Sequence, residues 1–292
     1  VDIDETDAIV LTDVDTNDGA ITIDAGGQIT ATDVDSSNTD DDSNDISLTS
    51  TGGGIEAHLV VAGSVNDVTL DAQGGPITEN SDAASDVTAD VLTADAAGGV
   101  DLDTTVASTD ISTSAAGDVD IDETDAIVLT DVDTNDGAVT VDAGGQITAT
   151  DVDSSNTDDD SNDITLTSTG GGIEAQLVVA GSSNDVTLDA QGGSITENSD
   201  AASDVTADEL TADAAGGVDL DTTVASTDIS TSAAGDVDID ETDAIVLTDV
   251  DTNDGAITID AGGNITATDV DSSNTDDDSN DIALTSTVGS IE

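Results

Sequence analysis

The sequence predicts an all-β fold, a parallel β-solenoid, and two observations support this prediction. The first is a long internal repeat: residues 1–118 recur at 119–236 with seven differences, and residues 237–292 form a third, partial copy. A repeat of this length is typical of solenoids and arrays, in which each unit contacts only its neighbours. The second is a shorter pattern of alternating aliphatic and polar residues inside each copy. We therefore expect one continuous rod, a fragment of a longer protein, rather than a compact domain.

Five alternating segments in the first copy mark the expected turns of the solenoid. They begin at Val1, Ile21, Ile46, Val68 and Val100. Their β-branched residues favour strands with one buried face. Most follow Gly or Asn-Asp, which are turn residues. These starts predict about five coils per 118-residue copy, or roughly 24 residues per coil.

Further short strands complete each expected coil. A second series begins at Ile9, Ile29, Ile55, Ile77 and Ile111, and a third passes near Val14, Val34, Val60 and Val87. Stacking would pair each strand in parallel with its counterpart in the next coil, at about 4.8 Å. The aliphatic residues would then form ladders inside the solenoid. Because Val91 becomes Glu209 in the second copy, we expect the alternation to break near that position.

The sequence is also extreme in its charge. It contains 68 Asp and Glu residues and no Lys or Arg, which gives a formal charge of −68. Nucleic acids and anionic membrane surfaces are bound through Lys and Arg, so neither is expected as a direct partner. Carboxylates in excess suit hard cations such as Ca²⁺. The alternative is that the charge only keeps a long fibre soluble.

Several residue types are missing altogether. There is no Cys, Phe, Tyr or Trp. The absence of Cys removes disulfides, thiol catalysis and thiolate metal sites. The absence of aromatic residues removes the usual stacking platform for sugars and bases. Any core must therefore consist of Val, Ile, Leu and Ala.

One run resembles a known family. The run Leu92-Thr93-Ala94-Asp95-Ala96-Ala97-Gly98-Gly99-Val100-Asp101-Leu102-Asp103-Thr104-Thr105-Val106 resembles the repeats of filamentous-haemagglutinin-like bacterial adhesins, as does the recurrent Gly-x-Val/Ile-x-Ile/Leu start. Those proteins are large, secreted surface proteins built on right-handed parallel β-helices. The resemblance implies a right-handed parallel β-helix and an extracellular or cell-surface location here.

Two acidic clusters are the candidate calcium sites. The first places oxygen donors at alternate positions, as at the start of an EF-hand loop. An Asn-Asp-Gly turn is slightly favoured over a full EF-hand, and a simpler calcium site stays open. Its candidate ligands are Asp13, Asp15, Asn17 and Asp18, with copies at Asp131, Asp133, Asn135 and Asp136 and at Asp249, Asp251, Asn253 and Asp254. The second is an acidic loop, which is either a solvated loop or a weak cation site. Its candidates are Asp33, Asp35, Asp40, Asp41 and Asp42, with copies at Asp151, Asp153, Asp269 and Asp271.

A third arrangement depends on the fold. One outward position in each coil reads Asp4, Asp24, Thr49, Asp71 and Asp103 in the first copy. Stacked carboxylates about 4.8 Å apart repel by roughly 1 kcal/mol even in water. Divalent ions between coils would convert this repulsion into cross-linking, whereas bulk salt would only screen it.

These observations favour a structural function over catalysis. We expect a non-catalytic stalk or fibre segment of a large secreted or surface-attached adhesin, stiffened by several weakly bound Ca²⁺ ions. Other copies of the rod and a host or prey cell surface are open as partners. The alternative is a ligand-binding solenoid that recognises ice or carbohydrate. A carbohydrate-active enzyme ranks third, because near-identical copies offer no single site for a carboxylate pair.

Overall fold

The computed structural model describes residues 1–37, 43–80, 84–156, 161–198, 202–272 and 280–292. These residues form an all-β fold without helices, in which parallel strands stack as a β-solenoid of about 12 turns. The predicted fold class is therefore confirmed. The chain divides into two compact units, Val1–Val141 and Asp142–Glu292. Within the described residues, no helix has the length and apolar character needed to span a membrane.

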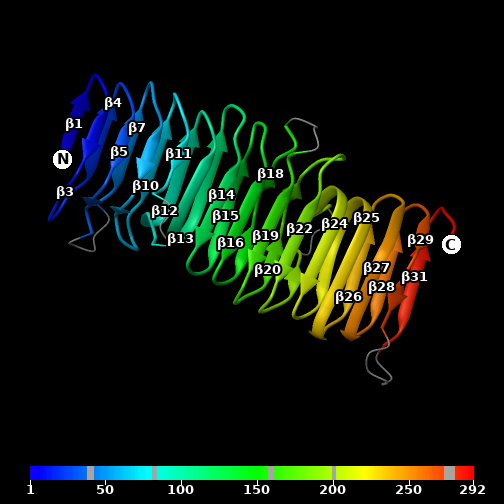
Figure 1. Cartoon of the computed structure of the whole chain (residues 1–292). Helices are drawn as coiled ribbons and strands as arrows, with labels where there is room; N and C mark the ends of the chain where they lie inside the picture. The colour runs from blue at the N-terminus through cyan, green and yellow to red at the C-terminus, as the bar shows by residue number, and fades with distance from the viewer. Residues whose placement is uncertain (38–42, 81–83, 157–160, 199–201, 273–279) are drawn as a thin grey trace. The chain divides into compact units, whose positions relative to one another are not determined.

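The first unit begins with turns of one longer and two shorter strands (Figure 1). Later in the unit, neighbouring strands fuse into longer ones that continue around a corner of the coil. The strands are β1 (Asp2–Glu5), β2 (Ile9–Leu11), β3 (Val14–Asp15), β4 (Ile21–Ala25), β5 (Ile29–Ala31), β6 (Val34–Asp35), β7 (Ile46–Ser50), β8 (Ile55–Ala57), β9 (Val60–Val61), β10 (Val68–Ala72), β11 (Ile77–Thr78), β12 (Val87–Ala96), β13 (Val100–Thr113), β14 (Val119–Glu123) and β15 (Ile127–Asp133).

Two columns of paired strands define the register of the first unit. The first column contains Ile21, Ile46, Val68, Leu92 and Thr109 as successive partners. The second contains Ile9, Ile29, Ile55, Ile77, Val100 and Val119. The predicted third series is confirmed for Val14, Val34, Val60 and Val87.

Two predicted strand starts are wrong. Val100 was expected above Val68, but Leu92 occupies that place and Val100 pairs with Ile77. Ile111 was expected in the second column, but it pairs with Ala94 in the first. The strand starting at Leu92 places small alanines at its inward positions, so it shows a weaker aliphatic alternation than the segment starting at Val100.

The register shows where each copy of the sequence begins. In the first column, Thr109 lies five turns after the position of Val1. Val119, which starts the second copy, lies in the second column. One copy therefore covers about five and a half turns, consistent with the predicted count of about five. The same residue types consequently face opposite sides of the coil at the start of successive copies.

The second unit has the same two-column arrangement. One column contains Ile147, Ile173, Ile195, Val218, Val237, Ile257 and Ile282, and the other Ile164, Val186, Leu210, Thr227 and Leu247. Its strands are β17 (Ile147–Ala149), β18 (Val152–Asp153), β19 (Ile164–Ser168), β20 (Ile173–Ala175), β21 (Val178–Val179), β22 (Val186–Ala190), β23 (Ile195–Thr196), β24 (Val205–Ala214), β25 (Val218–Ala234), β26 (Val237–Glu241), β27 (Ile245–Asp254), β28 (Ile257–Ala261), β29 (Ile265–Ala267), β30 (Val270–Asp271) and β31 (Ile282–Ser286). Strand β16 (Val139–Ala143) contains the boundary between the units.

The core of each unit consists of aliphatic ladders. Ile23, Leu48 and Leu70 follow one another in the first column and are all fully buried. Burying one such side chain contributes about 1.5–3 kcal/mol relative to leaving it exposed. The alternation breaks at Asp90 and Val91, which are both partly exposed, and this confirms the prediction made from Glu209. Burial of these aliphatic side chains therefore stabilises the fold, and functional side chains have to be sought at the outward positions.

Candidate metal centres

Three carboxylates of the first unit converge on one point and form the first triad, which consists of Glu79, Asp86 and Asp103. Glu79 follows β11, Asp86 directly precedes β12, and Asp103 lies on β13. Main-chain pairing fixes Asp86, because its N–H donates to the carbonyl oxygen of Asp103 at 2.7 Å. One carboxylate oxygen from each of the three residues lies within 4.8 Å of the others.

One member of the first triad is buried and the other two are partly exposed. Asp86 is 0% exposed, and its Oδ2 accepts the backbone N–H of Asp103 at 3.3 Å. The Oε2 atom of Glu79 is shielded from solvent and accepts no hydrogen bond from the residues that the structure describes. Because the sequence has no Lys or Arg, no such side chain can balance this charge. Burying a carboxylate costs free energy, and the hydrogen bond from the backbone N–H of Asp103 offsets part of that cost for Asp86.

The second unit contains the equivalent second triad, which consists of Glu197, Asp204 and Asp221. Asp204 is 1% exposed, its N–H donates to the carbonyl oxygen of Asp221 at 2.7 Å, and its Oδ2 accepts the N–H of Asp221 at 3.0 Å. The geometry of the first triad thus recurs. Among the described residues, these are the two groups in which at least three acidic side chains reach this spacing.

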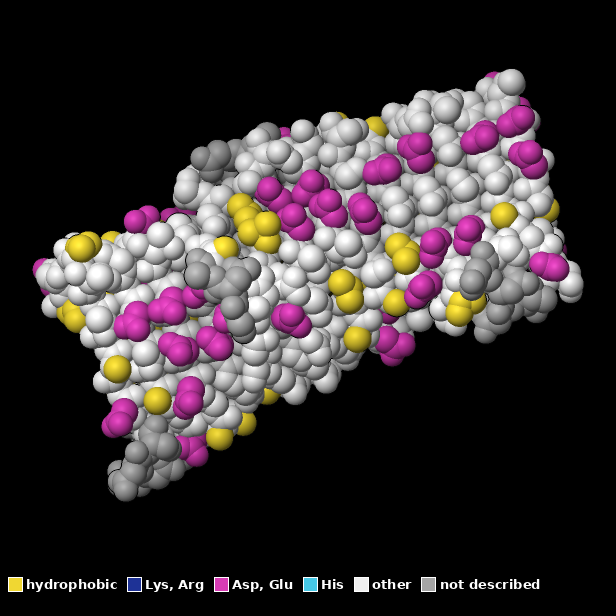
Figure 2. Space-filling view, turned by 180° about the vertical axis from the view of Figure 1, so that it is seen from behind, with side chains coloured by type: hydrophobic (Ala, Val, Ile, Leu, Met, Phe, Trp, Pro, Cys, Tyr) yellow, Lys and Arg dark blue, Asp and Glu magenta, His cyan; other side chains and the backbone are white. Residues whose placement is uncertain are grey.

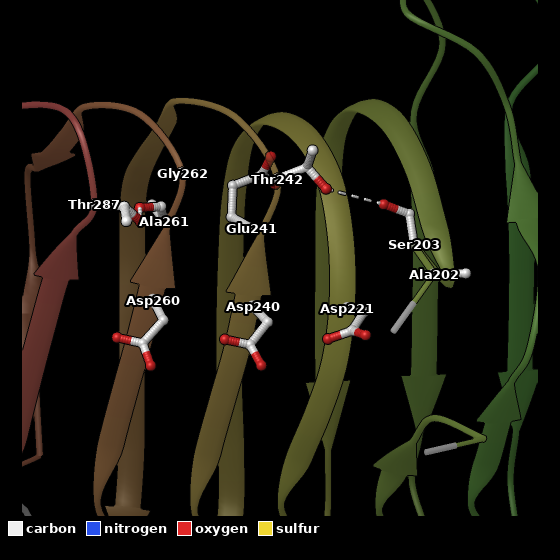
Figure 3. Close-up of a pocket in the computed structure, with 10 residues that line it drawn as sticks. All are labelled: Ala202, Ser203, Asp221, Asp240, Glu241, Thr242, Asp260, Ala261, Gly262 and Thr287. Carbon is white, nitrogen blue, oxygen red and sulfur yellow. Dashed lines mark hydrogen bonds between the residues drawn. The ribbon is translucent and has the colours of Figure 1, made fainter. Parts of the chain in front are cut away.

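The second triad shares Asp221 with a hollow of about 340 Å³. Asp221, Asp240 and Asp260 stand in a row on β25, β26 and β28, where they are successive register partners (Figure 3). Ser203 and Thr242 are joined across the hollow, with their hydroxyl oxygens 3.4 Å apart. Carboxylates from three successive strands therefore line one hollow, and one of them belongs to the second triad.

The structure brings the two predicted acidic clusters of the first copy together. Strand β3 pairs with β6, so that Asp15 and Asp35 are register partners in adjacent turns. Partial desolvation and the carboxylates of Asp13, Asp33 and Asp35 raise the pKa of Asp15. Four predicted ligands from two separate segments therefore form one acidic surface, which could not be seen from either cluster alone.

The acidic loop is closed at its base. The hydroxyl of Ser36 donates to the carbonyl oxygen of Asn44, and the N–H and hydroxyl of Ser37 both donate to Oδ1 of Asp35 at 2.7 Å. Asp35 thus has a structural role in the loop whether or not it binds an ion. The predicted ligands Asp40, Asp41 and Asp42 lie outside the described residues.

The third copy repeats the acidic surface of the first. Partial desolvation and the nearby carboxylates of Asp249, Asp271, Asp269 and Asp228 raise the pKa of Asp251. The second-copy residues Asp131 and Asp133 are register partners of Asp110 and Ser112 in the preceding turn. The N–H and hydroxyl of Ser155 both donate to Asp153. Asp151 directly precedes the short strand β18.

The remaining predicted ligands lie just before a glycine in each copy, in a bend in the first copy and at the end of β27 in the third. They are Asn17, Asp18, Asn135, Asp136, Asn253 and Asp254, which directly precede Gly19, Gly137 and Gly255. In the first copy, the hydroxyl of Thr16 donates to the carbonyl oxygen of Gly19 at 2.7 Å, and Gly19 has a φ of 118°. A glycine is required for that backbone conformation, so the Asn-Asp-Gly turn exists as a structural feature in its own right.

The predicted outward ladder forms with one change. Asp4, Asp24, Thr49 and Asp71 are successive partners, but Asp95 follows Asp71 where Asp103 was expected. This shift follows from the position of Leu92 in the first column. Acidic side chains form rows on the face of the molecule shown in Figure 2. Like charges therefore stack on successive turns.

The two triads were missed because their members are far apart in the sequence. Asp86 lies seven positions after Glu79, and Asp103 lies seventeen positions after Asp86, so no local motif links them. The register supplies the link, since Val87 pairs with Thr104 and thereby places Asp86 beside Asp103. A correct assignment of the strand starting at Leu92 would have revealed this pair.

The comparisons with known proteins give no relatives. No family model, curated protein or solved structure matches this chain.

Proposed function

We propose that this chain is a non-catalytic structural segment of a large secreted or cell-surface bacterial adhesin, and that calcium stiffens it. The observation that carries the proposal is the tandem repetition of one coil architecture. Each unit repeats the same two columns of strands, and near-identical copies supply them. Repetition extends a scaffold without adding chemistry, which suits a spacer that holds another domain at a distance.

The pairing between turns suits a mechanical role. Backbone hydrogen bonds join each turn to the next throughout a unit, with donor–acceptor distances near 2.9 Å at positions such as Ile9, Val14 and Thr22. In a solenoid, stability is approximately the sum of the stabilities of the turns and of their interfaces. The several backbone hydrogen bonds at each interface therefore act together against separation of neighbouring turns.

Charge is the reason for including calcium in the proposal. The stacked carboxylates repel one another, and neighbouring carboxylates contribute to raising the pKa values of Asp110, Asp228 and Asp238 after desolvation, the largest cause. With no Lys or Arg in the sequence, relief has to come from solution. Calcium is the divalent cation best suited to clustered oxygen ligands of flexible geometry.

Single-molecule pulling of the full chain tests the proposal. We expect unfolding in small successive steps, with forces that are higher in millimolar calcium than in excess chelator at matched ionic strength. Unfolding at near-zero force under both conditions would contradict a mechanical role for the chain. Turnover of a polysaccharide that one carboxylate substitution abolishes would contradict the non-catalytic assignment.

A surface-binding module is the second candidate, because the register aligns hydroxyl side chains. Thr22, Ser47, Thr69 and Thr93 are successive outward partners in the first unit. Such a row is a feature that a flat ice- or carbohydrate-binding face would need. However, the neighbouring outward row contains Asp24, Thr49, Asp71 and Asp95 and is mostly charged. Thermal hysteresis in solutions of the chain, lost on changing Thr69 and Thr93 to Lys, would favour this candidate over the scaffold.

A further inference from the structure

The last strand, β31, pairs on one side only among the described residues, with β28. Its first residue, Ile282, is 45% exposed, whereas Ile46 and Ile164 at the same repeat position are 1% and 0% exposed. A following turn covers both of these, since their N–H groups donate to the carbonyl oxygens of Asp67 and Asp185 at 3.0 Å. The same repeat position is therefore buried wherever another turn follows it.

The first strand, β1, presents the complementary edge. In the described part of the chain it pairs with β4 alone. Val1 is 48% exposed, whereas Val119 and Val237 at the same repeat position are 0% exposed, because β13 and β25 precede them. Strand β1 thus offers the face that receives a preceding turn, and β31 offers the face that receives a following one. Together the two edges are the two halves of the interface that joins successive turns inside each unit.

The spacing of the strand starts allows both columns to pair at once. In the last turn, Ile291 lies nine positions after Ile282. In the first turn, Ile9 lies eight positions after Val1. The first unit already contains a turn with a spacing of nine that is followed by a turn with a spacing of eight. Its register partners are Val68 with Leu92 and Ile77 with Val100. A first turn can therefore follow a last turn with both columns in register.

Strand β31 also has none of the usual protection of an edge strand. Natural proteins block such edges with charged side chains or proline. Strand β31 reads Ile-Ala-Leu-Thr-Ser and contains neither. In the register given above, Asp2 lies beside Ala283, and neither Asp2 nor Asp4 faces a carboxylate in β31. The junction therefore avoids the stacked like charges that occur on successive turns elsewhere.

We propose that copies of this chain associate head to tail, with β1 of one copy adding in parallel to β31 of another. The occupant of each edge is thus a second copy, and the contact continues the interface that the turns already form within each unit. Strand addition supplies main-chain hydrogen bonds and covers the exposed side chains of Val1 and Ile282. Because the two edges differ, each complex keeps one free edge of each kind, so further copies can add. This inference goes beyond the proposed function and does not depend on calcium.

Sedimentation velocity of the full chain in excess chelator tests the proposal. At about 0.15 M NaCl the Debye length is about 8 Å, so charges on distant turns are screened while charges on adjacent strands still interact. We expect the mean sedimentation coefficient to rise with protein concentration. A chain that stays monomeric over the whole concentration range would overturn the proposal, since solvent or another polypeptide would then cover these edges.

Charge changes at Ala283 locate the contact. Ala283→Asp places a carboxylate beside Asp2 of the next copy and should weaken association by about fivefold. Ala283→Lys should strengthen association by a similar factor, and adding Asp2→Lys should reverse that gain. The matched controls are Ser47→Asp and Ser47→Lys, which make the same changes of charge at the same repeat position of the internal strand β7. Both controls should associate like the parent chain.

The opposite signs keep the test decisive if one variant fails to fold. Circular dichroism of each variant shows whether its sheet structure is retained. If Ser47→Asp weakens association as much as Ala283→Asp does, or if folded Asp and Lys variants at position 283 shift it in the same direction, the copies associate through another face and the proposal is wrong. Ile282→Pro supplies a further arm, because it removes the N–H that corresponds to the donors of Ile46 and Ile164 and should abolish association. Undiminished association of a folded Ile282→Pro variant would contradict strand addition.

Discussion

At the scale of single residues, buried carboxylates govern how the fold responds to pH. Glu123 is 4% exposed, and its carboxylate accepts hydrogen bonds from the hydroxyl of Thr104 and the N–H groups of Val106 and Asp125, each at 2.9 Å. Burial nevertheless raises the pKa of Glu123, because desolvation outweighs these hydrogen bonds. Burial raises the pKa of Glu241 in the same way. Folding therefore makes both carboxyl groups easier to protonate than they are in the unfolded chain.

Stability without calcium is expected to fall as pH rises. A folded-state pKa above the unfolded value means that the folded chain binds more protons, so the stabilisation is complete below the unfolded pKa and is lost as pH rises through the folded pKa. The shifts of Glu123, Glu241, Asp15 and Asp251 are all upward from unperturbed values of 4.5 and 3.8. In excess chelator, the free energy of unfolding should therefore decrease from about pH 4 upward. Urea denaturation at several pH values measures this, and a stability that increases over that range would refute the expected sign.

The interior ladders should be intolerant of cavities. Leu48 is fully buried between Ile23 and Leu70, so Leu48→Ala should cost about 2–5 kcal/mol of unfolding free energy. The neighbouring outward substitution Ser47→Ala is the control and should cost less than about 0.5 kcal/mol. Equal effects of the two substitutions in chemical denaturation would mean that the inward and outward faces have been assigned wrongly.

At the scale of elements, glycines let the corners of successive turns approach closely. A Cβ atom built on Gly74 would lie 2.5 Å from the carbonyl carbon of Gly52, and one built on Gly52 would lie 2.6 Å from the carbonyl oxygen of Gly26. Both contacts are with backbone, which cannot move aside without disturbing the pairing of the strands. Glycines therefore stack on one another at the corner that follows β4, β7 and β10.

Gly74→Ala should destabilise the solenoid through this corner. We expect a loss of about 1–3 kcal/mol, as for other overpacked sites. Gln73→Ala, at an exposed position of the same turn, is the control and should cost little. Thermal melting followed by far-ultraviolet circular dichroism compares the two. A Gly74→Ala variant as stable as the control would show that the turns can separate there at no cost.

The elements also show which features the sequence could predict. Strands such as β4 and β10 were predictable because β-branched or leucine residues fill their inward positions. The end of β12 was missed because Ala94 and Ala96 fill the corresponding places. Alternation specifies which residues face inward, but only the pairing of whole strands specifies which residues stack. Sites formed across turns, such as the triads, depend on that second kind of information.

At the scale of the whole molecule, the repeat in sequence and the repeat in structure differ. One copy covers about five and a half turns, so Val119 continues the column of Ile9 rather than that of Val1. The corresponding start of the third copy, Val237, follows Val218 and Ile195 in the second unit. The structural period is therefore one turn. The same segment of sequence can form a strand of either column.

Removing one complete turn should preserve the fold. Ile46 and Val68 are partners in the first column, so deletion of residues 47–68 removes one turn and leaves the remaining strands in register. This variant should keep its β-sheet dichroism and a cooperative melt, with the loss of about one interface. Deletion of residues 47–57 leaves a coil too short to close and should be far less stable. Similar melting of both deletion variants would contradict the assigned turns.

We propose that this solenoid is a scaffold whose stability depends on divalent cations. The most direct test of this proposal is the melting temperature of the full chain in millimolar calcium, compared with excess chelator at matched ionic strength. Ions that bind the folded chain better than the unfolded chain stabilise it by mass action, with expected midpoints of about 10⁻⁴ to 10⁻³ M. We predict a melting temperature well below the calcium value when chelator is present. If sodium chloride restores stability as fully as calcium does, the effect is screening, and the claim of specific calcium sites is wrong.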